Sequence, residues 1–326
     1  MPDTPRQPAH NRSAHSRPTA GRPISALPSA RAEAAAIAAR LAGRRIALFL
    51  DYDGTLAAIA ARPDLALLDP ATRKVVSALA ERCFVAVVSG RDVEDVRAKV
   101  GIDDLIYAGS HGFDIEGPQD AHSGDAQPGG NHPGRTGEAL LPALDAAKAS
   151  LSHMLAELPG LLLERKRYSL AVHVRQVPRD RHDRVAQAVE AVLAAHPALS
   201  LVRGKMVFEL RPAVDWDKGR AMLWLLRFLE GERSEGERPG ARHPDIVPIY
   251  IGDDITDEDA FRALHELEGP NQSDGGGIGI VVGLQERDSL ADYVLARPTS
   301  VRDFLSFLLC LLDGASPAAA AKTLSG

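Results

Sequence analysis

Short, continuously apolar runs alternate with helical patterns in the first and last parts of the chain. Such runs, without the polar alternation of a half-exposed strand, are typical of a parallel sheet that is covered on both faces. The strands expected here are residues 46–50, 84–88, 105–108, 247–251 and 278–282, and the helices 29–43, 69–82, 93–100, 217–230, 256–267 and 301–312. The sequence therefore predicts a doubly wound α/β fold with a parallel sheet.

The middle of the chain follows a different pattern. Residues 116–137 are rich in Gly, Pro, His and Asp and are expected to form a loop. After it come a helix, two strands, a helix and two strands, at residues 138–158, 161–166, 168–175, 180–196, 199–203 and 206–210. We therefore expect an α+β domain inserted into a core that is split in sequence. The expected boundaries are a disordered tail at 1–28, a core of 29–115 and 212–313, an insertion at 116–211, and a flexible tail at 314–326.

Composition and charge narrow the class of protein. The 326 residues are 45% hydrophobic and 25% charged, which is typical of a globular protein with about two domains. The first 45 residues hold eight arginines against two acidic residues, so the remainder carries a net charge of −12. This balance argues against a nucleic-acid binder and suits a protein that uses carboxylates to bind cations.

Neither a membrane span nor a disulfide is expected. The longest strongly apolar stretch, Phe304–Leu312, is far shorter than the roughly 20 residues that a span needs. Cys83 and Cys310 each stand in an apolar run and outside any metal-ligand spacing, so we expect free thiols in a reducing compartment. No secretory signal is indicated, and we expect a cytoplasmic protein.

Candidate chemistry begins directly after the first core strand. Asp51 and Asp53 stand two residues apart in D-Y-D-G-T, at a strand end where α/β folds place ligands. One carboxylate can attack a phosphoryl group as a nucleophile, and the second can protonate the leaving oxygen. An EF-hand loop also begins D-x-D, but it needs glycine at its sixth position and a preceding helix.

A second acidic cluster, residues 252–259, follows another apolar strand. Carboxylates gathered in this way repel one another unless a cation is present, and oxygen-only ligands favour Mg²⁺. Thr256 and Asp259 have the spacing of a helix capping box, which accounts for those two residues. It does not account for Asp253 and Asp254.

Two further residues fit a phosphate site less specifically. Ser89 ends the second core strand, where a hydroxyl and backbone N–H groups can bind phosphoryl oxygens, although it could simply begin a turn. Lys218 begins the helix after the insertion. A lone lysine is usually a solvated surface residue, but an anionic phosphate beside two carboxylates needs a cation.

In this order, the four pieces resemble the haloacid dehalogenase (HAD) superfamily of phosphatases. The resemblance implies that Asp51 is the nucleophile, that Asp53 is the acid and base, and that Ser89 and Lys218 hold the phosphoryl group. It also implies that Mg²⁺ is bound by Asp51, Asp253 and the backbone carbonyl of Asp53. The inserted α+β domain is similar to the superfamily's mobile cap of the C2B type.

A closer resemblance is to trehalose-6-phosphate phosphatases, over about residues 44–312. Its motifs here are DYDGTL (51–56), VVSGRD (87–92), AGSHG (108–112), ERKRYSLAVHVR (164–175), GKMVFELRP (204–212), DKG (217–219) and IGDDITDED (251–259). The insertion motifs are the most discriminating ones, because the core motifs serve many phosphatases. Ala58, where the family commonly has proline, is a minor departure.

Strand alternation predicts two faces for the sheet of the insertion. Leu170, Val172 and Val174 fall on an apolar face. The polar face is expected to carry Glu164, Lys166, His173, Arg175 and Glu209. By its residues alone, this face could be an ordinary solvated surface. The resemblance implies that Glu164, Lys166 and Glu209 bind a sugar and that Arg91, His111 and Gly112 lie near the substrate.

We therefore expect a Mg²⁺-dependent phosphatase that hydrolyses trehalose 6-phosphate through an aspartyl-phosphate, in trehalose biosynthesis. Its expected partner is this small molecule alone, without nucleic acid or membrane, and we expect a monomer. Three alternatives stay open: a phosphatase for sucrose 6-phosphate or mannosyl-3-phosphoglycerate, a phosphomutase, and a sugar-phosphate-binding module without catalysis. The intact Asp51, Asp53, Lys218 and Asp253 argue against the last.

Overall fold

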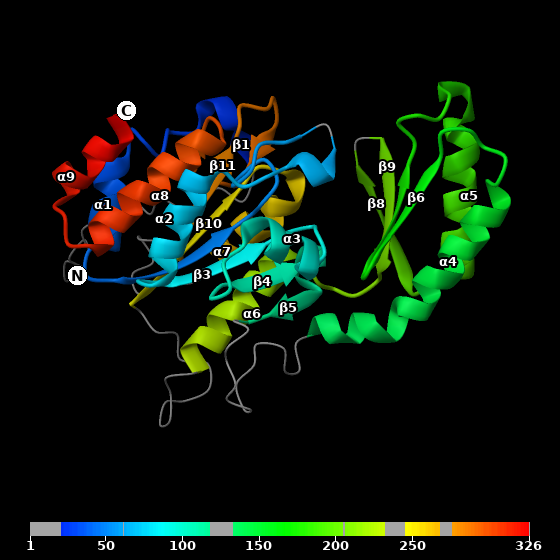
Figure 1. The fold of residues 1–326 in the computed structure, drawn as a ribbon, viewed down its shortest axis with the longest axis horizontal. Coiled ribbons are helices and arrows are strands. Elements are labelled where there is room, and N and C mark those ends of the chain that lie inside the picture. Colours follow the sequence, from blue (N-terminus) through cyan, green and yellow to red (C-terminus); the bar gives the residue numbers. More distant parts are fainter. Residues whose placement is uncertain are drawn as a thin grey trace, which may run out of the picture.

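A seven-stranded sheet forms the centre of the larger domain (Figure 1). The computed structural model describes residues 21–60, 62–117, 133–204, 206–231, 245–267 and 276–325. The sheet order is β13–β11–β10–β2–β3–β4–β5, and every neighbouring pair is parallel except β4 with β5. These strands are β2 (Arg45–Leu50), β3 (Phe84–Val88), β4 (Ile106–Gly109), β5 (Asp114–Glu116), β10 (Ile246–Gly252), β11 (Ile278–Val282) and β13 (Tyr293–Leu295).

Helices cover both faces of this sheet, as the apolar strands predicted. Along β2, Leu48 and Leu50 face one hydrophobic layer, whereas Ala47 and Phe49 face the other. The first layer is completed by α1 (Ala34–Leu41), α2 (Pro70–Ala80), α3 (Val93–Val100), α8 (Pro298–Leu312) and α9 (Pro317–Ala321), and the second by α6 (Lys218–Gly231) and α7 (Glu258–Glu266). The doubly wound α/β core is confirmed.

The inserted domain, which we call the cap, is a four-stranded antiparallel sheet with two helices on one face. Its sheet order is β6–β7–β9–β8. The elements are α4 (Leu141–Met154), β6 (Leu162–Lys166), β7 (Ser169–His173), α5 (His182–Ala195), β8 (Leu199–Gly204) and β9 (Val207–Pro212), which is the predicted order. Leu170, Val172 and Leu210 are fully buried against α4 and α5. Figure 1 shows the helices on the outer side of the cap and the other face of its sheet turned toward the core.

Both ends of the described chain are more ordered than predicted. Residues 1–20 of the expected disordered tail lie outside the described residues, but 21–28 contain β1 (Arg22–Pro23) and a 3₁₀ turn (Ile24–Ala26). Ile24 is buried in the core, and β1 pairs with β12 (Asp288–Ser289). At the other end, Ala320 and Leu324 are buried, so the predicted flexible tail was wrong for 314–325. Burial of a few apolar side chains holds each segment on the core.

Smaller differences concern short elements and loops. Within the predicted loop 116–137, residues 118–132 lie outside the described part, and a 3₁₀ segment (Pro133–Leu140) leads into α4. The segment 231–246, between α6 and β10, is described only at its two ends. The other 3₁₀ turns are Pro63–Leu65, Ser110–Gly112, Arg179–Arg181, Ile255–Asp257 and Lys322–Ser325. Among the described residues, no helix has the length and apolar character needed to cross a membrane.

Candidate active site

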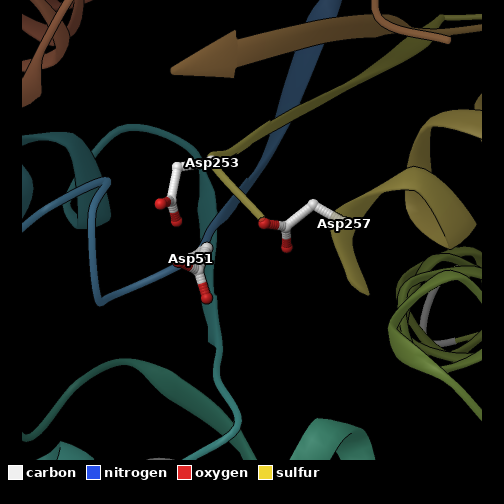
Figure 2. A group of neighbouring side chains, drawn as sticks. All are labelled: Asp51, Asp253 and Asp257. Carbon is white, nitrogen blue, oxygen red and sulfur yellow. The ribbon is translucent and has the colours of Figure 1, made fainter. Parts of the chain in front are cut away.

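Two adjacent strands bring the acidic motifs together at one edge of the core sheet. Leu50 of β2 pairs with Ile251 of β10 in parallel, so the residues that follow each strand lie side by side. Asp51 and Asp253 are only 4% and 8% exposed. One carboxylate oxygen from each of Asp51, Asp253 and Asp257 lies within 4.8 Å of the others (Figure 2). The two acidic motifs therefore meet at one edge of the sheet.

Lys218 enters this group from the first turn of α6. Its Nζ donates hydrogen bonds of 2.7 Å to Asp51 Oδ1 and 2.8 Å to Asp257 Oδ1, and its side chain is 3% exposed. Burial alone would lower the pKa of Lys218, but Asp257 and Asp51 raise it above the ordinary value. The lysine is therefore a fixed positive charge beside Asp51 and not a solvated surface residue.

Asp257 is held on three sides. Its Oδ1 also accepts a 2.7 Å hydrogen bond from the hydroxyl of Tyr250, and its Oδ2 accepts one of 2.9 Å from the Asp254 N–H. The capping box consists of Asp254 and Asp257, so the predicted pair of Thr256 and Asp259 was wrong. The pattern occurs twice, two residues apart, and the 3₁₀ turn that starts at Ile255 selects the earlier one.

The burial of three carboxylates leaves the cluster short of positive charge. Burial raises the pKa of Asp51 well above its usual range, although Lys218 opposes this. Burial, together with Asp257 and Asp254, raises the pKa of Asp253 to about 7. A divalent cation would relieve this repulsion, and a ligand set made only of oxygen atoms fits a hard cation such as Mg²⁺.

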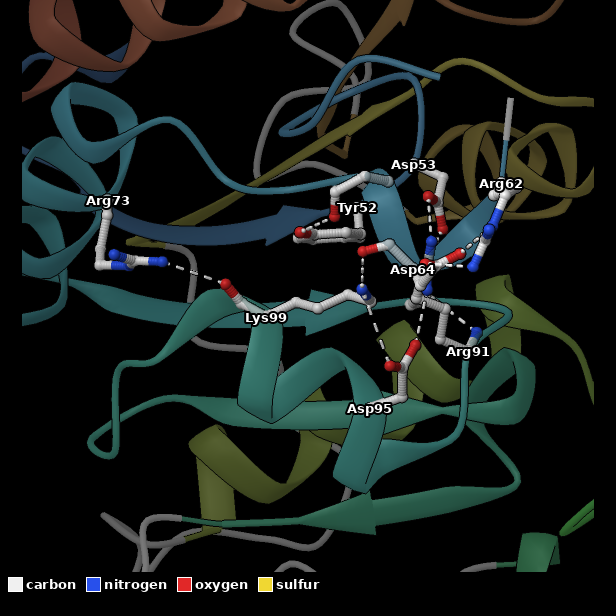
Figure 3. Close-up of polar contacts among 10 residues, drawn as sticks. Tyr52, Asp53, Arg62, Asp64, Arg73, Arg91, Asp95 and Lys99 are labelled. Atoms are coloured by element: carbon white, nitrogen blue, oxygen red, sulfur yellow. Dashed lines mark hydrogen bonds and ion pairs between the residues drawn. The ribbon is translucent and has the colours of Figure 1, made fainter. Parts of the chain in front are cut away.

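Asp53 lies apart from the three clustered carboxylates. Arg91 donates two hydrogen bonds to the Asp53 carboxylate, from Nε to Oδ2 at 2.6 Å and from Nη2 to Oδ1 at 2.7 Å (Figure 3). Arg91 also donates to Asp95 Oδ2 at 2.6 Å. Gly54 follows Asp53 and lies against Asp253. Its φ is +81°, and a Cβ there would lie 2.1 Å from Asp253 Oδ2, so the position needs glycine both for its backbone conformation and for the close approach. The two carboxylates of D-x-D therefore point to different partners.

The ends of β3 and β4 add Ser89 and His111 to the same edge of the sheet. Ser89 is 1% exposed, and its Oγ accepts a 3.1 Å hydrogen bond from the Arg91 N–H. Its carbonyl accepts one of 2.8 Å from the His111 N–H. The imidazole of His111 lies against Gly90, where a Cβ would be 2.8 Å from the ring. Gly112 comes next, and its carbonyl accepts a 2.7 Å hydrogen bond from Trp216 Nε1.

The cap presents the polar face that strand alternation predicted. Glu164 pairs with Ala171, and Ala171 with Glu209, so the three share one face across β6, β7 and β9. Lys166 lies two residues beyond Glu164 and shares this face, which is opposite to the buried Leu170 and Val172. His173 lies on it too. Arg175 is exposed beyond the end of β7 and is not part of the paired sheet.

Ion pairs organise this polar face. His173 Nε2 lies 2.8 Å from Glu164 Oε2, and this hydrogen bond lowers the pKa of Glu164. Glu209 pairs with Arg211, whose Nη2 also lies 2.7 Å from His111 Nε2 of the core. Arg211 was not singled out from the sequence, although its position two residues after Glu209 on a strand places it on the same face.

A second contact joins the cap to the core at β5, the last core strand before the cap. Arg167, in the turn between β6 and β7, forms a 2.6 Å ion pair with Asp114 of β5. Its backbone N–H lies 3.2 Å from both carboxylate oxygens of Asp92. The ring of Tyr168 stacks on Phe113 with centroids 5.9 Å apart. This end of the cap sheet is therefore anchored to the core.

Comparison with solved structures shows a shared fold. The C-terminal domain of Candida albicans trehalose-6-phosphate phosphatase matches with a TM-score of 0.62 at 22% identity, over 89% of this chain and 99% of that one. This likeness, which is shared with a haloacid dehalogenase-like hydrolase from Bacteroides thetaiotaomicron, shows that the chain has a HAD-like fold.

The profile of the trehalose-phosphatase family matches residues 49–299. "Probable trehalose-phosphate phosphatase 4" of rice is 39% identical over 279 residues, which cover 85% of this chain and 70% of the rice protein. Trehalose-phosphate phosphatase B of Arabidopsis thaliana is also 39% identical, over 267 residues that cover 82% and 67% of the two chains. The chain belongs to the trehalose-phosphatase family.

Proposed function

We propose that this protein is a Mg²⁺-dependent phosphatase that hydrolyses trehalose 6-phosphate to trehalose and phosphate. The observation that carries this proposal is the buried pair of Asp51 and Lys218 beside Asp253, in a chain of the trehalose-phosphatase family. The partner is this small-molecule phosphate ester. That the protein acts as a monomer in the cytoplasm, without nucleic acid or membrane, remains a prediction.

The reaction proceeds in two steps at Asp51. A carboxylate oxygen of Asp51 forms a bond to phosphorus while the bond from phosphorus to the sugar oxygen breaks, and protonated Asp53 donates its proton to that oxygen. A water molecule then attacks the aspartyl-phosphate, Asp53 takes one of its protons, and Asp51 and phosphate are released. Arg91 must first release Asp53, because both of its carboxylate oxygens accept hydrogen bonds from that guanidinium.

Asp51, Asp253 and the backbone carbonyl of Asp53 are the groups assigned to the cation. When bound, Mg²⁺ would screen the repulsion between the Asp51 carboxylate and the phosphate dianion. Asp257 has a different assignment, because three donors already satisfy it: Lys218, Tyr250 and the Asp254 N–H. It holds Lys218 in place beside Asp51. Lys218 and Ser89 then hold the phosphoryl oxygens.

We assign the recognition of the sugar to residues of both the cap and the core. Glu164, Lys166 and Glu209 occupy one face of the cap sheet, where carboxylates and an ammonium group can bind sugar hydroxyls. Arg91, His111 and Gly112 are assigned to the substrate from the core edge, and this is supported by Arg211, which connects His111 to Glu209. These contacts would close over the disaccharide as the cap approaches the core.

A phosphate-release assay with and without Mg²⁺ tests the proposal. The substrates are trehalose 6-phosphate, sucrose 6-phosphate, glucose 6-phosphate and mannosyl-3-phosphoglycerate. We expect the highest kcat/KM with trehalose 6-phosphate, and only when Mg²⁺ is present. Preference for another ester would contradict the substrate while leaving the chemistry in place. Transfer of phosphate between sugar positions, or tight binding without turnover, would contradict the phosphatase itself.

A further inference from the structure

The loop after β11 reaches across to the loop that carries Asp253. Arg287 Nη2 donates a 3.0 Å hydrogen bond to the backbone carbonyl of Asp253. Through Nη1, Arg287 also pairs with Glu258, the first residue of α7. Glu258 Oε2 in turn accepts a 2.8 Å hydrogen bond from the Leu290 N–H. These contacts form a closed connection between the acidic loop 252–258 and the neighbouring loop 283–291.

The N-terminal segment fixes the other side of the same loop. In the β1–β12 pair, Arg22 is opposite Ser289 and Pro23 is opposite Asp288. The Ile24 N–H then donates a 3.0 Å hydrogen bond to the carbonyl of Arg287. Ile24 is 1% exposed in the hydrophobic layer that also contains α6 and α7. The N-terminal segment therefore fixes the backbone of Arg287, and the side chain of Arg287 in turn contacts the backbone of Asp253.

The Asp253 peptide needs such support. Asp253 directly follows β10, and one of its carboxylate oxygens lies within 4.8 Å of those of Asp51 and Asp257. A charge-assisted hydrogen bond from a partly buried guanidinium, 23% exposed, resists movement of this peptide. Groups that orient the residues binding a metal commonly change metal affinity by about 10- to 100-fold when they are removed.

We propose that Arg287, anchored by residues 22–24, is a positioning residue that holds Asp253 in place for cation binding. The inference rests on the proposed function, since the cation belongs to it. It gives a role to the N-terminal segment, which the sequence had indicated as a disordered tail. Its side chain contacts Glu258 and the backbone carbonyls of Asp253 and Asp288, so we assign it no direct part in the reaction.

The test is the Mg²⁺ affinity of the full chain with Arg287→Met, measured by calorimetry without substrate. We expect the Kd for Mg²⁺ to rise about tenfold. Activity with p-nitrophenyl phosphate should need correspondingly more Mg²⁺, while kcat at saturating Mg²⁺ stays within about twofold. Arg262→Met is the matched control, because Arg262 pairs with Asp259 on the exposed side of α7 and should leave the Kd unchanged.

Deletion of the segment provides a second measurement. Removal of residues 2–27 should weaken Mg²⁺ binding in the same direction, whereas removal of residues 2–20 should not. Should Arg287→Met fail to fold, Arg287→Lys keeps the charge and the stem but loses the forked geometry, and it should still weaken binding several-fold. Equal Mg²⁺ affinity in wild type and the Arg287 variants would overturn this role alone. A wild-type protein that binds no Mg²⁺ would overturn the cation of the proposed function as well.

Discussion

The ammonium group of Lys218 lies 2.7 Å from Asp51 although 167 residues separate the two in sequence. The whole cap lies between them in the chain, so the pair closes only when the two halves of the core assemble. Lys218 is also 2.8 Å from Asp257, which makes it a bridge between the acidic residues after β2 and those after β10. Folding of the split core and formation of the candidate nucleophile site are thus the same event.

Asp51→Asn should abolish turnover and leave the fold intact. The amide has nearly the same shape but cannot attack phosphorus, so we expect kcat to fall by roughly a thousandfold or more. Phosphate release measures the loss, and circular dichroism checks the fold. Activity within about tenfold of wild type would reject Asp51 as the nucleophile.

Removal of the cation should stop the reaction reversibly. We expect EDTA to abolish activity and added Mg²⁺ to restore it, because Asp51 and a dianionic phosphate otherwise repel each other. Asp253→Ala should raise the Mg²⁺ concentration for half-maximal activity by more than about tenfold, since it deletes a candidate ligand. Full activity in excess chelator would contradict the metal assignment.

The contribution of Asp51 and Asp253 to the stability of the metal-free protein should fall as the pH rises. Burial raises the pKa of Asp253 to about 7 and that of Asp51 well above its usual range. These acids bind protons more tightly in the folded than in the unfolded chain, so stability present at low pH is lost as they ionise. In EDTA, the melting temperature of the wild type should fall relative to that of Asp253→Asn between about pH 4 and about pH 7.

Mg²⁺ should remove most of this pH dependence, because the cation favours the ionised carboxylates. Asp253→Asn should reduce it as well, even without the metal. Differential scanning fluorimetry across this pH range measures both effects. A melting temperature in EDTA that rises over this interval relative to that of Asp253→Asn would contradict the raised pKa of Asp253.

Glu164→Ala and Glu209→Ala should affect the disaccharide substrate selectively. Each variant leaves substrate hydroxyls without a partner, which costs about 1–3 kcal/mol, so we expect kcat/KM for trehalose 6-phosphate to fall about 10- to 100-fold. Turnover of p-nitrophenyl phosphate, which is too small to reach the cap sheet, should stay within about twofold. Glu190→Ala is the control, since Glu190 pairs with Arg203 and both side chains are exposed. A parallel loss on both substrates would indicate a structural role.

His173 should act through Glu164. Its 2.8 Å hydrogen bond fixes the carboxylate, so His173→Ala should raise KM for trehalose 6-phosphate several-fold with little change in kcat. His173→Gln, which retains a side-chain donor, should recover most of the loss. The control is His182→Gln, because the ring of His182 bonds only to the Val177 carbonyl among the contacts described. An unchanged KM in His173→Ala would exclude this positioning.

Local patterns predicted the parts of the site that depend on strand ends and strand faces. The acidic residues after β2 and β10 were found because continuous apolar runs mark buried parallel strands, whose carboxyl ends share one edge. Glu164 and Glu209 could be placed on one face because side chains alternate along a strand. These inferences need only the neighbouring residues in the chain.

Contacts between distant segments could not be predicted in this way. β1 and β12 have two residues each, and nothing in either sequence indicates that they pair across more than 260 positions. The partner of Arg211 is His111, which lies 100 residues away in the chain. The partner of Arg287 is Asp253, which lies 34 residues away. An arginine pattern alone does not distinguish such partners from solvent, because most surface arginines are simply hydrated.

The anchored turn at Arg167 gives the cap sheet one fixed end about which it can rotate. The Lys166 end of the sheet is held at the core by Arg167 and Tyr168, whereas the Leu162 and His173 end is free of those contacts. If the cap rotates about this anchored end, Leu162 and His173 move the furthest and Lys166 moves the least. Such a rotation would leave Lys166 close to its place beside the core, while Glu164 and His173 would move further.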